Sequence, residues 1–255
     1  MPLSTSILVE ENPTIAYVPL DGEQFIRELL FPIPLGLAML LVADDYEPQS
    51  IFAILIEKMS VKQEGAAPRT VDAAEFARLL GELDLHGSTQ WVSDPNQENA
   101  VVIRWSDADE PVARKLAGLL GLRYPSDRVL RLRVTDSAVE AVPGELVLST
   151  RSIGDLLRVG GAAMDVPSEH IDTGLARALP AASKAGRHIA IQGSRSRPDD
   201  PYVAVKLHGR WYWIASTDIR TKRFFKLLTT LISVRLSDSI QGNSQGPVLT
   251  IPTAR

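Results

Sequence analysis

Positively charged side chains, with aromatic residues among them, are the strongest chemical feature of this sequence. They gather between residues 195 and 226, and Trp211, Tyr212 and Trp213 lie in the same stretch. Lysine and arginine bind phosphates, and aromatic rings stack on nucleobases. A solvated charged face and tryptophans that pack in a core explain the same pattern without a ligand. The cations that form this candidate binding set are Arg195, Arg197, Lys206, Arg210, Arg220, Lys222, Arg223 and Lys226.

A second group with the right chemistry for an anion is Ser149, Thr150, Arg151 and Ser152. It stands directly before a predicted helix, and the free N–H groups at a helix N-terminus attract negative charge. Hydroxyl side chains at such a position also cap the helix itself, which is their more common role. The sequence therefore predicts either an anion-binding site or ordinary capping at these four residues.

Recognisable signatures of catalysis, metal binding and cofactor binding are missing from the sequence. The chain has no cysteine, which excludes disulfides, thiolate nucleophiles and cysteine-ligated zinc. None of the four histidines pairs with another at the i, i+4 spacing of a metal site, and no P-loop, GxGxxG or GxSxG motif occurs. We therefore predict no cofactor and no metal, and we expect binding rather than catalysis. A metal-dependent hydrolase with ligands from distant segments stays as one alternative.

The cations must be positioned by a strand, a tight turn, a second strand and a helix. Residues 203–208 alternate apolar and polar side chains, and residues 210–215 are rich in aromatic residues that suit a half-buried strand. Gly209 between them supplies the positive φ of a tight hairpin. A helix is predicted over 218–236, with its N-cap at Ser216, Thr217 or Asp218. Its predicted buried stripe is Phe224, Leu228, Leu231 and Ile232.

The rest of the chain predicts an α+β fold, with helices packed on mixed and antiparallel sheets. Residues 35–43 fit either a helix or a strand, and residues 61–69 look like a surface loop. Helices are predicted over 21–30, 48–59, 70–83, 107–120 and 153–163, and strands over 14–18, 89–92, 100–105, 128–134, 145–148, 188–192 and 248–251.

The two halves of the sequence differ in charge. Residues 1–150 carry 12 Lys and Arg against 23 Asp and Glu, whereas residues 151–226 carry 13 against 7. We predict an acidic N-terminal α+β lobe over 1–142 and a C-terminal α+β lobe with a basic face over 143–255, built on the hairpin and its helix. The basic half can face nucleic acid, an acidic partner or the acidic half of the same chain, and these readings stay open.

The sequence also bears on location and function. The first residues have no signal-peptide pattern, and the most apolar run, residues 31–43, is shorter than the ~20 residues of a spanning helix. We expect a soluble cytoplasmic protein with no membrane partner. The leading hypothesis is a non-enzymatic binding or assembly subunit of a complex, which meets a protein partner or itself through a charged surface. Nucleic-acid binding through the basic C-terminal region is the other alternative.

Overall fold

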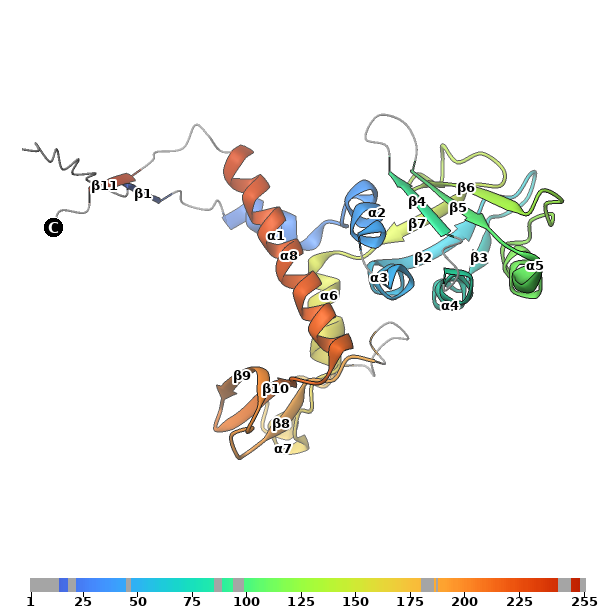
Figure 1. The fold of residues 1–255 in the computed structure, drawn as a ribbon. Coiled ribbons are helices and arrows are strands. Elements are labelled where there is room, and N and C mark those ends of the chain that lie inside the picture. Colours follow the sequence, from blue (N-terminus) through green and yellow to red (C-terminus); the bar gives the residue numbers. More distant parts are fainter. Residues whose placement is uncertain are drawn as a thin grey trace, which may run out of the picture.

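The computed structural model describes residues 14–17, 22–44, 47–84, 89–93, 99–179, 186, 188–242 and 249–252. These residues confirm the predicted α+β class, with helices packed on a mixed six-stranded sheet and a separate three-stranded antiparallel sheet (Figure 1). Within this part of the chain, no helix combines the length and the apolarity needed to cross a membrane.

The large sheet has the strand order β3-β2-β7-β6-β5-β4. Neighbouring strands are antiparallel except β6 and β7, which run parallel. β7 follows the lobe boundary predicted near residue 142, and it lies inside this sheet between β2 and β6. The strands are β2 (Ile56–Val61), β3 (Arg69–Val71), β4 (Thr89–Ser93), β5 (Asn99–Arg104), β6 (Val129–Thr135) and β7 (Leu146–Thr150).

Helices α2, α3, α4 and α5 lie along one face of the large sheet (Figure 1). The strict alternation of β6 fits this arrangement, because Leu130, Leu132 and Val134 are buried while Arg131 and Arg133 are exposed. The helices are α2 (Leu35–Ala43), α3 (Pro48–Leu55), α4 (Ala73–Asp84) and α5 (Glu110–Leu120), and a short 3-10 helix, η1 (Asp107–Asp109), leads into α5. Gly121 ends α5 with a φ of 68°, as is typical of a glycine that follows a helix.

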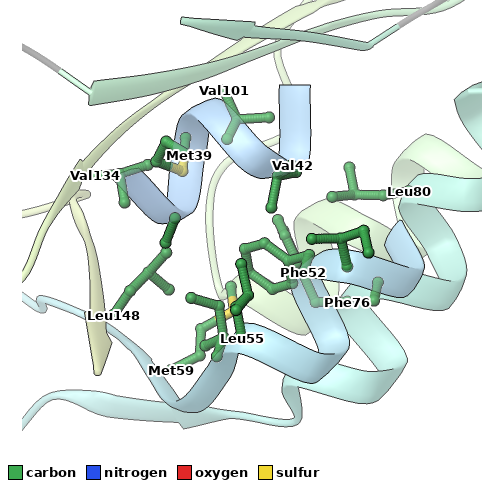
Figure 2. Close-up of a cluster of buried hydrophobic side chains, with 14 of the residues drawn as sticks. Met39, Val42, Phe52, Leu55, Met59, Phe76, Leu80, Val101, Val134 and Leu148 are labelled. Atoms are coloured by element: carbon green, nitrogen blue, oxygen red, sulfur yellow. The ribbon is translucent and has the colours of Figure 1, made fainter. Parts of the chain in front are cut away.

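The core fills the space between this sheet and its helices (Figure 2). Phe52 is fully buried, and its ring centroid lies 5.3 Å from that of Phe76 and 5.6 Å from that of Trp91. Residues 35–43 form a helix because Met39 and Val42 can then join this cluster from one side. Periodicity alone left this segment open, since its apolar residues continue around the whole helix.

The predicted helix over 48–59 is too long, because α3 ends at Leu55 and β2 begins at Ile56. Met59 pairs with Leu148 of β7 on one side and with Val71 of β3 on the other, so tertiary pairing overrides the helical spacing. The surface loop predicted over 61–69 is shorter for the same reason. Val61 is fully buried at the end of β2, and Arg69 opens β3.

The remaining elements form a second group around helix α8 (Ile219–Gly242), which packs on α1 (Gly22–Leu30) and α6 (Ile153–Ala162). The small sheet lies near the start of α8, together with α7 (Ser168–Asp172) (Figure 1). The strand predicted over 188–192 starts later than expected. Ile191 forms an isolated β-bridge with Met164, and β8 spans Gln192–Ser194. The other strands are β9 (Pro201–Leu207) and β10 (Arg210–Ala215), and β1 (Thr14–Tyr17) pairs with β11 (Leu249–Pro252).

The predicted hairpin and helix are confirmed in detail. His208 and Gly209 have φ values of 47° and 79°, which is the type I′ turn that matches the twist of a hairpin. Asp218 is the N-cap of α8, since its carboxylate accepts the backbone N–H of Thr221 at 3.0 Å. Of the predicted buried stripe, Phe224, Leu228 and Leu231 are buried, and Ile232 is only partly buried. α8 continues to Gly242, past the predicted end at residue 236.

Candidate functional site: the open edge of the small sheet

The small sheet ends in a strand with an open side. Its strand order is β8-β10-β9, so among the described strands β9 pairs only with β10. Three aliphatic side chains of β9 are exposed: Val203 at 38%, Val205 at 60% and Leu207 at 54% of their full surface. An outer strand with exposed aliphatic side chains is a template for pairing with another strand.

The backbone of β9 alternates between the two sides of the strand. Leu207 and Arg210 flank a two-residue turn, so the carbonyl of Leu207 accepts the N–H of Arg210 and the two form a hydrogen-bonded pair. In an antiparallel ladder such pairs alternate with non-hydrogen-bonded pairs. The N–H and C=O groups of Ala204 and Lys206 therefore point away from β10, toward the open side. Near Pro201 a shift in register makes Tyr202 an extra residue, which limits the regular open edge to residues 203–207.

The exposed aliphatic residues continue a buried apolar surface. Val203 and Val205 stand opposite Ile214 and Tyr212, and those two β10 residues are only 4% and 6% exposed. The same face of the sheet is therefore buried at β10 and exposed at β9. A strand added beside β9 would extend this face and shield it from water, which is favourable at about 25 cal/mol per Å² of apolar surface.

The predicted cations of the small sheet make contacts within the chain. Arg210 donates to the Asp165 carboxylate at 2.8 Å and to the Gly193 carbonyl at 2.9 Å. Arg195 pairs with Glu169 at 3.2 Å. The cationic groups of Arg197 and Lys206 lie 5.7 and 6.0 Å from the Trp211 ring centroid, which makes two cation–π contacts. Their role in binding nucleic acid stays a prediction.

Two of the predicted cations of α8 contact other parts of the chain, and the other two are exposed. Arg223 pairs with Glu47, which precedes α3, at 2.7 Å. Lys222 donates to the Ser216 carbonyl at 2.6 Å and lies over the Tyr202 ring, while Arg220 and Lys226 are exposed. A further pair, Arg235 with Glu28 of α1 at 2.7 Å, also joins the basic half of the sequence to the acidic half. These contacts favour the reading in which the two halves face each other.

In the predicted anion site at residues 149–152, Thr150, Arg151 and Ser152 make hydrogen bonds to other groups of the same chain. The Arg151 guanidinium donates to the carbonyls of Ala53 at 3.1 Å, Ile54 at 2.5 Å and Ile56 at 2.7 Å. Its burial lowers the pKa of this side chain from its usual value. Thr150 donates to the Ile33 carbonyl, and Ser149 is exposed on β7. Arg151 thus closes the C-terminal end of α3 and fixes the start of β2.

Ser152 caps α6 with Asp155. The Ser152 hydroxyl accepts the backbone N–H of Asp155 at 3.0 Å, and the Asp155 carboxylate accepts the backbone N–H of Ser152 at 2.9 Å. Partial burial raises the pKa of Asp155, but the hydrogen bonds from Ser152 and the ion pair with Arg158 outweigh it and hold that pKa below its usual value.

This capping pair predicts a pH-dependent stability that Asp155→Asn removes. The pKa of Asp155 is lower in the folded state, so its charge stabilises the fold above about pH 3.9 and loses that effect as the pH falls through the folded pKa. The wild type should be more stable than the variant by about 1 kcal/mol at pH 5, and this difference should shrink as the pH falls below about 3.9. Urea unfolding of both proteins across this range measures it. A difference that stays constant with pH would contradict the assignment.

In the described part of the chain, no group of three or more His, Asp or Glu side chains is arranged to hold a metal ion. His188 and His208 lie apart, one before β8 and the other in the hairpin turn, and His170 lies in α7. His86 falls outside the described residues.

Comparison of the chain with protein-family models, with curated proteins and with solved structures gives no match.

Proposed function

We propose that this chain is a binding subunit that assembles with a second copy of itself through antiparallel pairing of the two β9 strands. One observation carries the proposal: Val203, Val205 and Leu207 are exposed on a strand whose outer side no described strand covers. Pairing would satisfy the outward backbone groups and remove these side chains from water. The small sheet of one copy would then continue into that of the other.

The backbone alternation allows symmetric registers in which the outward groups of Ala204 and Lys206 pair with one another, and the one that uses the whole edge from 203 to 207 is centred on Val205. The outward groups of Ala204 in one copy pair with those of Lys206 in the second copy, so the two-fold axis passes through Val205. Val205 then faces Val205, and Val203 faces Leu207. Because side chains alternate with a period of two, all three aliphatic residues of each copy fall on the same face of the joined sheet.

Charge supports this register over its neighbour. Lys206 is the only charged residue of β9. A register centred on Lys206 would set the two ammonium groups directly opposite each other, which is unfavourable. Centring on Val205 places each Lys206 opposite Ala204. A lysine on an outer strand also discourages unselective pairing, so the same residue favours the ordered dimer over aggregation.

The Val205→Lys variant tests the proposal. Because pairing of two short strands buries less than the ~1,200 Å² of a standard interface, we expect the wild type to dimerise with a Kd on the order of 10 µM. The variant should stay monomeric at all concentrations, since it sets two ammonium groups against each other on the axis. Sedimentation velocity from about 1 to 200 µM measures this, a range that brackets the expected Kd.

The matched control is Val139→Lys, which adds the same charge at a residue that is 93% exposed outside the small sheet. It should dimerise as the wild type does, and circular dichroism should show that both variants are folded. A wild type that stays monomeric throughout would rule out self-pairing. A dimer that survives Val205→Lys would place the contact on another surface and would also rule out the proposal.

A further inference from the structure

A cavity of about 470 Å³ lies where α3 and α4 meet the first turns of α8, and β9 takes no part in its lining. Cavities of this volume are typical of sites for small molecules. Small residues on two packed helices make room for it, since Ala53 comes from α3 and Ala77 and Gly81 come from α4. Ile54 and Ile189 add larger apolar surface.

The charges around this cavity leave one guanidinium unmatched. Glu47 pairs with Arg223 at 2.7 Å, and Glu82 pairs with Arg78, so both acids of the lining are neutralised within the chain. Arg220 also lines the cavity and is exposed, and no carboxylate of the described residues pairs with it.

The position of Arg220 gives it no role in stabilising its own helix. It lies in the first turn of α8, and a cation is unfavourable near a helix N-terminus. His188 lines the same cavity and adds a second nitrogen donor. A planar guanidinium with free donors beside an apolar cavity is suited to bind a carboxylate or a phosphate with two parallel hydrogen bonds.

We propose that this cavity binds a small organic anion, with its apolar body against Ala53, Ala77 and Ile189 and its carboxylate or phosphate on Arg220. A ligand held this way touches α3, α4 and α8 together. It would therefore strengthen the junction that the Arg223–Glu47 pair already makes between the two halves of the sequence. This inference does not depend on pairing of the β9 strands.

Fluorine NMR of the full-length chain with three probes tests this site. The probes are 4-fluorobenzoate, 4-fluorophenyl phosphate and the neutral 4-fluorobenzyl alcohol. We expect at least one of the two anions to bind with a Kd on the order of 1 mM, as ligand efficiency predicts for about ten non-hydrogen atoms, and the alcohol to bind at least tenfold more weakly. The stronger of the two anions identifies the preferred acidic group.

Arg220→Gln should weaken binding of that anion at least tenfold, because the neutral amide cannot form the charged bidentate contact. The matched control is Arg131→Gln, which removes an arginine that is exposed on β6. It should leave the Kd unchanged, and so should Val205→Lys. Failure of both anions to bind at about 10 mM, tenfold above the expected Kd, would overturn the proposal. The proposal would also be overturned if the alcohol bound as tightly as the anions, or if Arg220→Gln bound the anion as tightly as the wild type does.

Discussion

Arg151→Ala is expected to lower the free energy of unfolding by about 3 kcal/mol. In the folded chain this one guanidinium donates to the carbonyls of Ala53, Ile54 and Ile56. Alanine leaves these carbonyls at the junction of α3 and β2 without their donor, and each unsatisfied buried group costs about 1–3 kcal/mol. The expected loss of stability is smaller than the sum of the penalties for the three carbonyls, because water can reach part of the space that the side chain leaves.

Urea unfolding at neutral pH measures this loss, and Arg158→Ala is the matched control. Arg158 is an exposed arginine of α6 that pairs with Asp155 on the surface, and such pairs contribute less than about 1 kcal/mol. If Arg151→Ala costs no more than Arg158→Ala, then the guanidinium does not hold the end of α3.

Local patterns predicted the elements whose structure depends on neighbours in sequence. Gly209 between two alternating segments indicated the hairpin, and the apolar spacing around Phe224 and Leu228 indicated the helix that follows. β6 was predicted for the same reason, since strict alternation means one buried face. The end of α5 followed from Gly121, because glycine adopts positive φ at no steric cost.

Non-local contacts explain the parts of the fold that the sequence did not predict. Residues 56–59 carry apolar side chains at a spacing that fits a helix, and they form part of β2 because β3 and β7 pair with this strand on both sides. Arg151 was grouped with its sequence neighbours in a predicted anion site, and the sequence did not show that it also donates to carbonyls about 95 residues earlier in the chain. Spacing along the sequence carries no signal for such contacts.

The candidate site shows the same limit. The alternation of Val203, Val205 and Leu207 was evident, but alternation indicates a buried face and does not show where a strand lies in its sheet. Only the strand order shows that β9 lies at the edge of its sheet. The cavity beside Arg220 was equally hidden, because α3, α4 and α8 meet there from three distant parts of the sequence.

Val205→Cys should convert the proposed dimer into a covalent one. Val205 of each copy would lie on the two-fold axis in a non-hydrogen-bonded pair, where Cα atoms are about 4.5 Å apart and a disulfide can form without moving the backbone. The natural chain has no cysteine, so a disulfide between two chains must join the two introduced residues. Val205 is exposed, so the substitution should leave the monomer folded.

The oxidation of this variant is the most direct test of assembly through β9. Oxidised glutathione takes up the two thiol protons and electrons, and non-reducing gel electrophoresis reads the product, with Val139→Cys treated in parallel as the control. At a concentration near the expected Kd, most of the Val205→Cys chains should be cross-linked dimers within about an hour, while the control stays monomeric. If Val205→Cys forms no more dimer than Val139→Cys does, the β9 strands do not pair and the proposed function is wrong.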